Sequence, residues 1–323
     1  MKILVTGATG FVGQELLARL AKEPDYVARV ALRRPDATLP FDVERFPVHD
    51  FDSAECSTAL RSCEAVVHLA ARVHVMRETS ADPLLEFRRV NVEGTLALAR
   101  RAVDAGVRRF VFLSSIKVNG EETAPGRPFR AGDPANPGDA YGVSKLEAER
   151  GLQAIARTRG MELIIVRSPL VYGPGVKANF LQLMRWLYRR APLPLGAVTD
   201  NRRSLIALEN LSDLLVTCLS HRSVGSQVFL ASDGEDLSTA QLLNRIGIAL
   251  GRPARLPAIP PVVVQSLGTL VGRGDQVRRL LGSLQVDISA TRDLLGWTPP
   301  MSVDHALART AAHFLKQVQE SQR

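Results

Sequence analysis

The strongest constraint on this chain lies at its start, where a strand pattern runs directly into a glycine-rich loop. KILVT (2–6) is an apolar run, TGATGFVG (6–13) follows it, and a helical pattern begins inside the loop. Gly7 permits a tight turn, Gly10 lets the main chain approach a pyrophosphate, and Gly13 allows close helix–strand packing. The helix N-terminus would offer free N–H groups to phosphates. The loop predicts a dinucleotide site; a turn that binds nothing is the alternative.

The first half of the chain alternates between strand and helix patterns. Its strand segments are apolar throughout, which is typical of parallel strands covered by helices on both faces. We therefore predict an α/β fold with a Rossmann-type doubly wound parallel sheet. The predicted strands are 2–6, 27–32, 65–70, 109–115 and 162–168, and the two long helices are 84–105 and 140–158.

The second half has a different pattern. Prolines and glycines cluster there, short helices are predicted, and QVFLAS (227–232) is the one segment that resembles a further strand of the sheet. We therefore predict a dinucleotide-binding domain over 1–171, to which that strand returns, and a smaller, mainly helical substrate-binding part over 172–323. The cleft between them is the expected ligand site. The helices predicted in this part are 178–190, 210–220, 238–250 and 303–318.

The net charge of +8 at pH 7 favours a negatively charged ligand. The basic residues are scattered singly and in pairs, and aromatic residues make up only 5%, so stacking platforms for bases are scarce. Small phosphorylated ligands are therefore expected, and nucleic acid is not. The three cysteines and six histidines show no metal-ligand spacing, so no metal site is predicted.

The sequence pattern predicts neither a membrane-spanning helix nor a signal peptide. The most apolar late stretch, 259–272, is too short to span a bilayer and contains two prolines and two glycines. The chain opens directly on its first strand, without the pattern of a signal peptide. A cytoplasmic location is expected, with the cysteines as small core residues in a reducing compartment.

The end of the second predicted strand bears on the choice of dinucleotide. A carboxylate at this position would hold the ribose hydroxyls of NAD, but here Arg33 and Arg34 follow the strand. Two guanidinium groups suit a 2′-phosphate, through paired charge-assisted hydrogen bonds. NADP(H) is therefore favoured. NAD(H) remains open, in which case both arginines are solvated surface residues.

The segment YGVSK (141–145) places Tyr141 and Lys145 one turn apart on a helix face. A phenol with a pKa of about 10 is a poor base at neutral pH, and a nearby ammonium lowers that pKa. The tyrosine can then exchange a proton with a carbinol oxygen while hydride moves to or from nicotinamide. Ser115, at the carboxyl edge of the sheet, can hydrogen-bond the same oxygen; Ser114 is the competing candidate.

Seven motifs carry a resemblance to a known family: TGATGFVG (6–13), HLAA (68–71), NVEGT (91–95), YGVSKLEAE (141–149), RSPLVYGPG (167–175), RRSLIALENLSDLL (202–215) and DISATRDLLGW (287–297). Together they resemble the extended short-chain dehydrogenase/reductases and, more narrowly, the NAD(P)-dependent nucleotide-sugar epimerase/dehydratase family. The resemblance covers nearly the whole chain. It selects Ser115 over Ser114 as the catalytic hydroxyl and treats His68 as a core residue rather than a general base.

The resemblance also implies roles for single residues. Asn91 would order the active-site lysine and a water, unless it is a solvent-facing helix residue, and Asp50 would hold the adenine amino group. Asn179 and Arg203 would bind the substrate diphosphate, with a weaker case for Arg279 because the spacing differs there. The cofactor contacts predicted are Gly7, Thr9, Gly10, Phe11, Val12, Gly13, Arg33, Arg34, Asp50, Phe51, Leu69, Ala70, Ala71, Asn91, Ser114, Tyr141, Lys145 and Pro169, and the substrate contacts are Ser115, Lys117, Asn179, Arg203 and Arg279.

Three reactions compete within this family. A 4,6-dehydratase would carry an Asp-Glu pair after the catalytic hydroxyl, where this chain has Ile116 and Lys117. The arginines after the second strand favour a 4-keto reductase over the other two. The segments SSIKVNGE (114–121), YGPGVKANF (172–180), PLPLGAV (192–198) and SLQVDIS (283–289) resemble one subfamily. That resemblance implies reduction of a UDP-4-keto-6-deoxy-N-acetylhexosamine to UDP-N-acetylquinovosamine or UDP-N-acetylfucosamine for surface polysaccharide. The alternatives are an NAD-dependent 4-epimerase of UDP-glucose or UDP-N-acetylglucosamine, and a non-catalytic dinucleotide-binding regulator. A homodimer, packed through the two long helices, is also implied.

Overall fold

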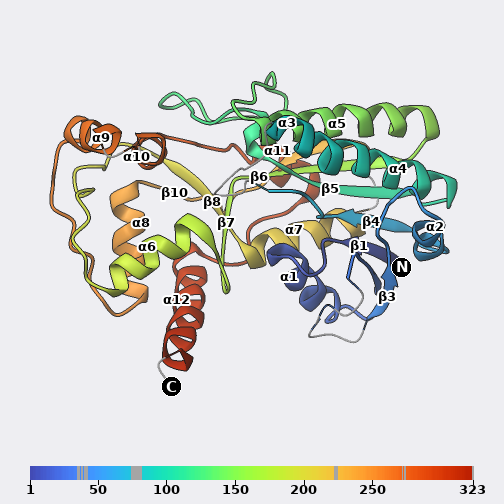
Figure 1. The fold of residues 1–323 in the computed structure, drawn as a ribbon, viewed down its shortest axis with the longest axis horizontal. Coiled ribbons are helices and arrows are strands. Elements are labelled where there is room, and N and C mark those ends of the chain that lie inside the picture. Colours follow the sequence, from blue (N-terminus) through green and yellow to red (C-terminus); the bar gives the residue numbers. More distant parts are fainter. Residues whose placement is uncertain are drawn as a thin grey trace.

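The computed structural model describes residues 1–321, except 35, 36, 38, 40–42, 74–81, 222–224, 271 and 273. Its centre is a sheet of seven parallel strands in the order β3-β2-β1-β4-β5-β6-β9 (Figure 1). The chain moves outward from β1 to β3, then returns to the other side of β1 with β4. This confirms the doubly wound Rossmann-type sheet. The strands are β1 (Lys2–Thr6), β2 (Val27–Leu32), β3 (Glu44–Pro47), β4 (Ala65–His68), β5 (Arg109–Ser115), β6 (Glu162–Ser168) and β9 (Gln227–Leu230).

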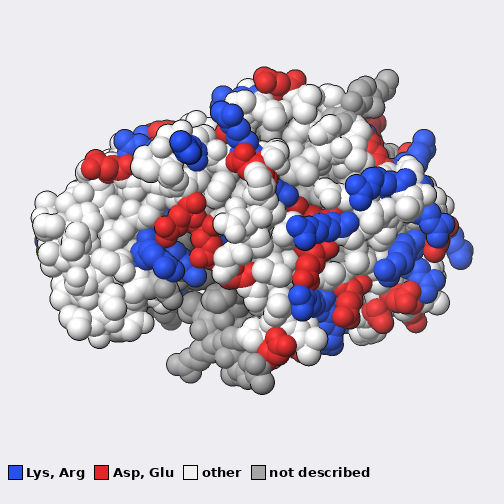
Figure 2. All heavy atoms as spheres, turned by 90° about the horizontal axis from the view of Figure 1, so that it is seen from above, with Lys and Arg blue, Asp and Glu red and all other residues white. Residues whose placement is uncertain are grey.

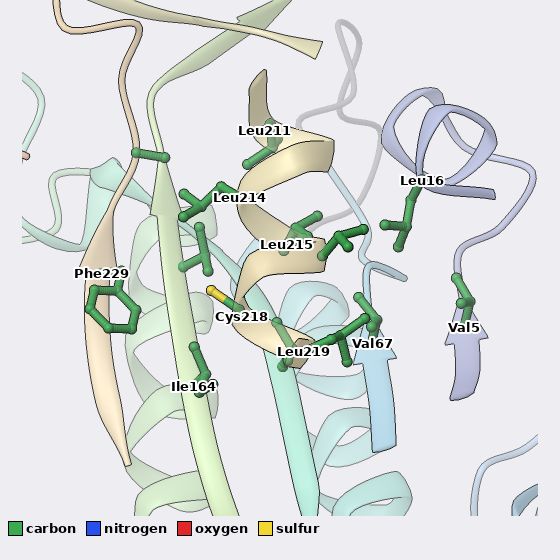
Figure 3. Packing of buried hydrophobic residues seen from close by; sticks show 14 of the residues in the cluster. Val5, Leu16, Val67, Ile164, Leu211, Leu214, Leu215, Cys218, Leu219 and Phe229 are labelled. Carbon is green, nitrogen blue, oxygen red and sulfur yellow. The ribbon is translucent and has the colours of Figure 1, made fainter. Parts of the chain in front are cut away.

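Helices cover both faces of the sheet, which explains why its strands are apolar throughout. One face is covered by α1 (Phe11–Leu20) and α7 (Leu208–Ser220), which pack against each other. Figure 3 shows leucines of α7, with Cys218, packed among strand residues such as Val67, Ile164 and Phe229. The other face is covered by α2 (Ala54–Leu60), α4 (Gly94–Asp104) and α5 (Ala140–Arg159).

The predicted helix over 84–105 is interrupted by a turn of a different kind. The structure has α3 (Pro83–Phe87), then a π-helical segment over Arg88–Glu93, then α4. A π-helical turn contains an extra residue, and such turns are frequent at functional sites. Asn91 lies in this segment and is 1% exposed, so it is not the solvent-facing helix residue that was the alternative.

The second part of the molecule combines helices with a small sheet. Its strands are β7 (Leu170–Tyr172), β8 (Arg203–Ala207) and β10 (Asp236–Leu237), in the order β10-β8-β7. These strands were not predicted, because two to five residues are too few to show an alternating pattern. A second core lies among its helices, which are α6 (Ala178–Tyr188), α8 (Thr239–Ala249), α9 (Pro261–Leu270), α10 (Gly274–Leu281) and α12 (Val303–Glu320).

The chain crosses between the two parts more than once. After β7 and β8 it returns with α7 and β9 to the large sheet, leaves again, and returns with α11 (Ser289–Leu295). The three cysteines are buried and unpaired, as expected of core residues. Within the part of the chain that the structure describes, no helix has the length and apolarity that a membrane crossing requires.

Figure 2 views the molecule from above and shows basic and acidic side chains interleaved over the end that carries the large sheet. The opposite end is largely uncharged on this face. A duplex or strand of nucleic acid is usually met by a continuous basic field. The described residues of the face seen here form no such field.

Replacing Gly13 by alanine tests the packing of α1 against the glycine loop. A Cβ at this position would lie 2.2 Å from the Gly7 carbonyl oxygen and 2.7 Å from the Ala8 Cα, both main-chain atoms that cannot move aside cheaply. We expect Gly13→Ala to lower the free energy of unfolding by about 1–3 kcal/mol, measured by urea denaturation. Gly132→Ala is the control, because nothing lies within 4 Å of its Cβ position. Equal effects of the two substitutions would contradict this packing.

Candidate functional site

The glycine loop has the geometry that a phosphate-binding turn needs. Gly7 takes a φ of 71°, and a Cβ there would lie 2.7 Å from the Ala70 nitrogen. Gly10 is exposed and is the N-cap of α1, and no side chain caps that helix. The N–H groups of Phe11 and Val12 at its start therefore have no side-chain cap, and the adjacent Thr9 and Gly10 are exposed. This uncapped helix N-terminus fits a pyrophosphate.

The loop after β4 lies directly against the glycine loop. The Leu69 N–H donates to the Thr6 carbonyl at 3.2 Å, and the Ala70 N–H donates to the Thr6 hydroxyl at 3.3 Å. β1 and β4 are the neighbours at which the strand order reverses. Ligands of doubly wound sheets bind at this reversal, outside the carboxyl ends of the strands. The structure thus brings the predicted segment 69–71 to the same edge as the glycine loop.

The predicted adenine end of the site lies at the carboxyl ends of β2 and β3. Arg33 and Arg34 follow β2 directly and are exposed. Asp50 is also exposed, and its Oδ1 accepts a hydrogen bond from the Asp52 N–H at 3.0 Å. Phe51 lies edge-on to His68, with ring centroids 5.7 Å apart. These residues lie near one another along the carboxyl edge of the sheet, and their roles toward a cofactor stay predictions.

Tyr141 lies in the first turn of α5. Asp139 is the N-cap of this helix, and its Oδ1 accepts a hydrogen bond from the Gly142 N–H at 2.7 Å. Burial, and then the nearby Asp139 carboxylate, raise the pKa of Tyr141 to about 12. The sequence predicted a lowered pKa through Lys145. The structure differs because the phenol is desolvated and its charged neighbour is an anion.

Lys145 lies one turn further along the same helix and is 2% exposed. Its Nζ lies 4.0 Å from the centroid of the Phe112 ring. Burial lowers the pKa of Lys145 to about 7, and the Glu149 carboxylate opposes that shift only in part. The ammonium is therefore readily deprotonated in this environment.

The two serines at the end of β5 point to opposite sides of the strand. Ser115 is half-buried, and its Oγ accepts a hydrogen bond from the Lys117 N–H at 3.3 Å. The short turn after it packs against α5, because a Cβ at Gly142 would lie 2.9 Å from the Lys117 carbonyl oxygen. Ser114 is 3% exposed and donates its hydroxyl hydrogen to Glu149 at 2.5 Å. This orientation supports Ser115 as the serine that faces a ligand.

A buried ion pair beneath the site was not predicted from the sequence. The Arg167 guanidinium of β6 donates to both carboxylate oxygens of Glu149 of α5, at 3.0 and 2.6 Å. Its remaining nitrogen donates to the Asn119 Oδ1 at 2.9 Å. Glu149 follows Lys145 by four residues, so it lies on the same face of α5. That spacing, within the motif YGVSKLEAE, was a signal that could have found it.

The polar side-chain atoms of Asn91 and His68 all form hydrogen bonds within the protein. The Asn91 side chain accepts from the Arg72 N–H at 2.8 Å and donates to the Arg72 carbonyl at 3.0 Å and to the Ser144 hydroxyl at 3.0 Å. Ser144 adjoins Lys145, so Asn91 orders the turn that carries the lysine. His68 lies 2.6 Å from the Thr6 hydroxyl and 2.9 Å from that of Thr95.

Burial, and then the charge of Lys145, lower the pKa of His68 to about 3. Its imidazole is therefore neutral at physiological pH and is bonded at both nitrogens. A general base needs a free nitrogen and a pKa closer to neutrality. His68 is thus a satisfied core histidine, as the sequence analysis expected.

Of the predicted substrate residues, Asn179, Arg203 and Arg279 lie in the second part, and only the last two are neighbours. The Arg203 guanidinium donates to the main-chain carbonyls of Arg279, at 2.5 Å, and of Gly282, at 3.1 Å. Arg203 and Arg279 are therefore neighbours. Burial lowers the pKa of the Arg203 guanidinium. Asn179 is exposed in the first turn of α6. Lys117 instead forms ion pairs with Asp139 and, at 3.5 Å, with Glu121. Their roles toward a substrate stay predictions.

The model of the NAD dependent epimerase/dehydratase family matches residues 3–231. The chain belongs to this family. Most of the site described above, from the glycine loop to Lys145, falls within the matched segment. The resemblance inferred from the motifs is thereby confirmed, and the chain is an enzyme of the short-chain dehydrogenase/reductase type.

Two relatives and one solved structure are similar over almost the whole chain. A UDP-glucose 4-epimerase of Vibrio cholerae is 47% identical over 315 residues, covering 97% of this chain and 95% of that protein. A UDP-glucose 4-epimerase of Mycolicibacterium smegmatis is 28% identical, covering 97% and 98%. MoeE5, solved with UDP-glucuronic acid and NAD, is 26% identical with a TM-score of 0.77, covering 98% and 100%.

These similarities change two predictions. The relative at 47% identity is a 4-epimerase, which favours that alternative over the 4-keto reductase. MoeE5 was solved with NAD, and no comparison supports the preference for NADP that Arg33 and Arg34 suggested. Both arginines are exposed, which agrees with the alternative that they are solvated surface residues.

Breaking the buried ion pair tests its part in holding the site. We expect Arg167→Met to lower the free energy of unfolding by about 3–5 kcal/mol, because it leaves the Glu149 carboxylate buried and unpaired. Arg88→Met is the matched control: its partner is Glu147 and the two side chains are 45% and 30% exposed, so the loss should stay below about 1 kcal/mol. Comparable losses in thermal or urea unfolding would show that the buried pair is dispensable.

Proposed function

We propose that this enzyme is an NAD-dependent 4-epimerase of UDP-hexoses, with UDP-glucose as the first substrate to test. The observation that carries the proposal is 47% identity, over nearly the full length of both chains, to a UDP-glucose 4-epimerase. A complete set of proton-transfer groups supports it: Tyr141 and Lys145 on α5, and Ser115 at the end of β5.

The glycine loop and the segments after β2, β3 and β4 would hold the NAD cofactor, which would supply a reversible acceptor for the hydride at C4. Tyr141 takes the proton from the 4-hydroxyl oxygen and later gives it back. Ser115 hydrogen-bonds the same oxygen and so holds it near the phenol. Lys145, with a pKa of about 7, can carry either protonation state near neutral pH.

The substrate diphosphate would lie in the second part of the molecule. Arg203 and Arg279 are adjacent there, and guanidinium groups bind phosphate oxygens strongly. Asn179, exposed at the start of α6, would add a further donor. In this proposal, residues 1–171 hold the cofactor and residues 172–323 mainly hold the substrate, as the sequence predicts.

The 4-keto reductase is the second candidate. The observation that favours it is the pair Arg33 and Arg34 at the end of β2, where a 2′-phosphate could be bound. An epimerase needs to keep its cofactor, since each catalytic cycle restores it. A reductase consumes NADPH and must exchange it. The two candidates therefore differ in the nucleotide that remains on the purified protein.

Mass spectrometry of the nucleotide released from denatured, dialysed protein tests this difference. We expect retained NAD, together with conversion of UDP-glucose to its C4 epimer without added cofactor. An empty protein that binds NADPH much more tightly than NADH, and that does not convert UDP-glucose, would instead support the reductase.

Replacing Tyr141 by phenylalanine tests the proton carrier. We expect Tyr141→Phe to lower turnover by about 10²–10⁴-fold while the unfolding midpoint changes little, because only a hydroxyl is lost. Tyr26→Phe is the control, since Tyr26 precedes β2 at the opposite, amino edge of the sheet. If both variants kept wild-type turnover, Tyr141 would not be the proton carrier.

We also propose a homodimer formed through the outer faces of α3, α4 and α5. These helices lie side by side (Figure 1), and Leu85 of α3 is 59% exposed. Sedimentation equilibrium should give twice the chain mass of 35.2 kDa, and Leu85→Asp should shift the population toward the monomer. A monomer at micromolar concentration would contradict this assembly.

A further inference from the structure

The ammonium of Lys117 lies at the start of the catalytic helix but is held by carboxylates. Its Nζ contacts Asp139, and it lies 3.5 Å from the Glu121 carboxylate. Lys117 belongs to the turn that follows Ser115, so the contact with Asp139 joins the end of β5 to the start of α5. One ion pair therefore joins the end of β5, which carries Ser115, to the start of α5, which carries Tyr141.

The carboxylate of Asp139 stabilises the start of α5 but opposes the ionisation of Tyr141. As the N-cap of α5 it accepts the Gly142 N–H, and a carboxylate suits this position because the helix N-terminus is positive. The same carboxylate lies two residues before Tyr141, whose phenol must lose a proton to act as a base. After burial, the charge of Asp139 is the cause that raises the pKa of Tyr141.

Other charged groups around this carboxylate do not replace Lys117. Burial alone would raise the pKa of Asp139, but the hydrogen bonds from Lys117 and Gly142, and then the charges of Lys117 and Arg279, lower it overall. Arg279 of α10 lowers the pKa of Asp139 through its charge alone. Lys145 lies on the same helix as Tyr141, but its burial disfavours the ammonium form. Glu121 adds a second negative charge to the group.

We propose that Lys117 is a positioning residue that keeps the Asp139 carboxylate paired, so that the cap of the catalytic helix does not act on Tyr141 as a free negative charge. The inference rests on the proposed role of Tyr141 as the proton carrier. It assigns Lys117 a role through Asp139, in place of the direct substrate contact predicted from the sequence.

The sign of the expected effect follows from these charges. Removing the Lys117 ammonium leaves the Asp139 carboxylate without its cation, so its negative charge opposes loss of the Tyr141 proton more strongly. The acidic limb of the pH profile of kcat/KM should then move to higher pH in Lys117→Met, by on the order of one pH unit. At a fixed pH on that limb, a shift of one unit is about a tenfold loss, which is recovered as the pH rises.

Four further variants make the test specific. Asp139→Asn removes the charge but keeps a side chain that caps helices well, so its acidic limb should move to lower pH. In the Asp139→Asn background, Lys117→Met should leave the limb unchanged. Lys117→Arg should restore the wild-type profile. Glu121→Gln is the matched control, because it removes the other partner of Lys117 and leaves the pair with Asp139 intact.

A spectroscopic titration gives a readout that does not depend on turnover. The ionisation of Tyr141 is the difference in phenolate absorbance between each variant and the same variant carrying Tyr141→Phe, in a chain with four tyrosines. The midpoint should be highest in Lys117→Met and lowest in Asp139→Asn.

The outcomes separate this inference from the proposed function. If Tyr141→Phe keeps full turnover, the proposed role of Tyr141 fails. If Tyr141→Phe loses turnover but Lys117→Met raises KM alone, with no shift of the limb or of the phenolate midpoint, Lys117 is a substrate contact and the inference is overturned. A uniform loss at every pH, which Lys117→Arg does not restore, would also overturn it.

Discussion

The arrangement of the site depends on one buried ion pair. Arg167 of β6 and Glu149 of α5 bond through two hydrogen bonds in a place where both side chains are almost fully buried. Ser114 of β5 donates to the same carboxylate, so the pair ties the helix to two strands. A lone charge in this environment would cost several kcal/mol, which leaves little freedom for α5 to move relative to the sheet. Tyr141 and Lys145 lie on α5, so the same ion pair sets where they lie relative to the sheet.

A second set of contacts holds the cofactor end of the same edge. His68 joins β4 to Thr6 of β1 and to Thr95 of α4, and it does so as a neutral ring. The segment after His68 is thereby held against the glycine loop. The two sets of contacts meet across β5, whose last residues face the ion pair on one side and the proposed ligand on the other. Both sets of contacts therefore lie along the same carboxyl edge of the sheet.

The sequence supported the sheet, the glycine loop and the Tyr141–Lys145 pair, because each depends on local spacing along one strand or one helix. It was less informative on the reaction. Ser115, Tyr141 and Lys145 serve a reductase and an epimerase equally, and the arginines after β2 turned the prediction toward NADP. Similarity over the whole chain favours the epimerase instead, since that comparison weighs many positions of the substrate part at once.

The order of elements and the types of reactive groups follow from the sequence alone, because hydrophobic periodicity and motif spacing act over a few residues. The pairing of charges depends instead on how distant segments pack together. Glu149 with Arg167, and Lys117 with Asp139, are separated by 18 and 22 residues along the chain. Whether such groups meet depends on the packing of α5 against the sheet. The protonation of Tyr141 and Lys145 is set by the burial and charges that this packing creates, which no local pattern contains.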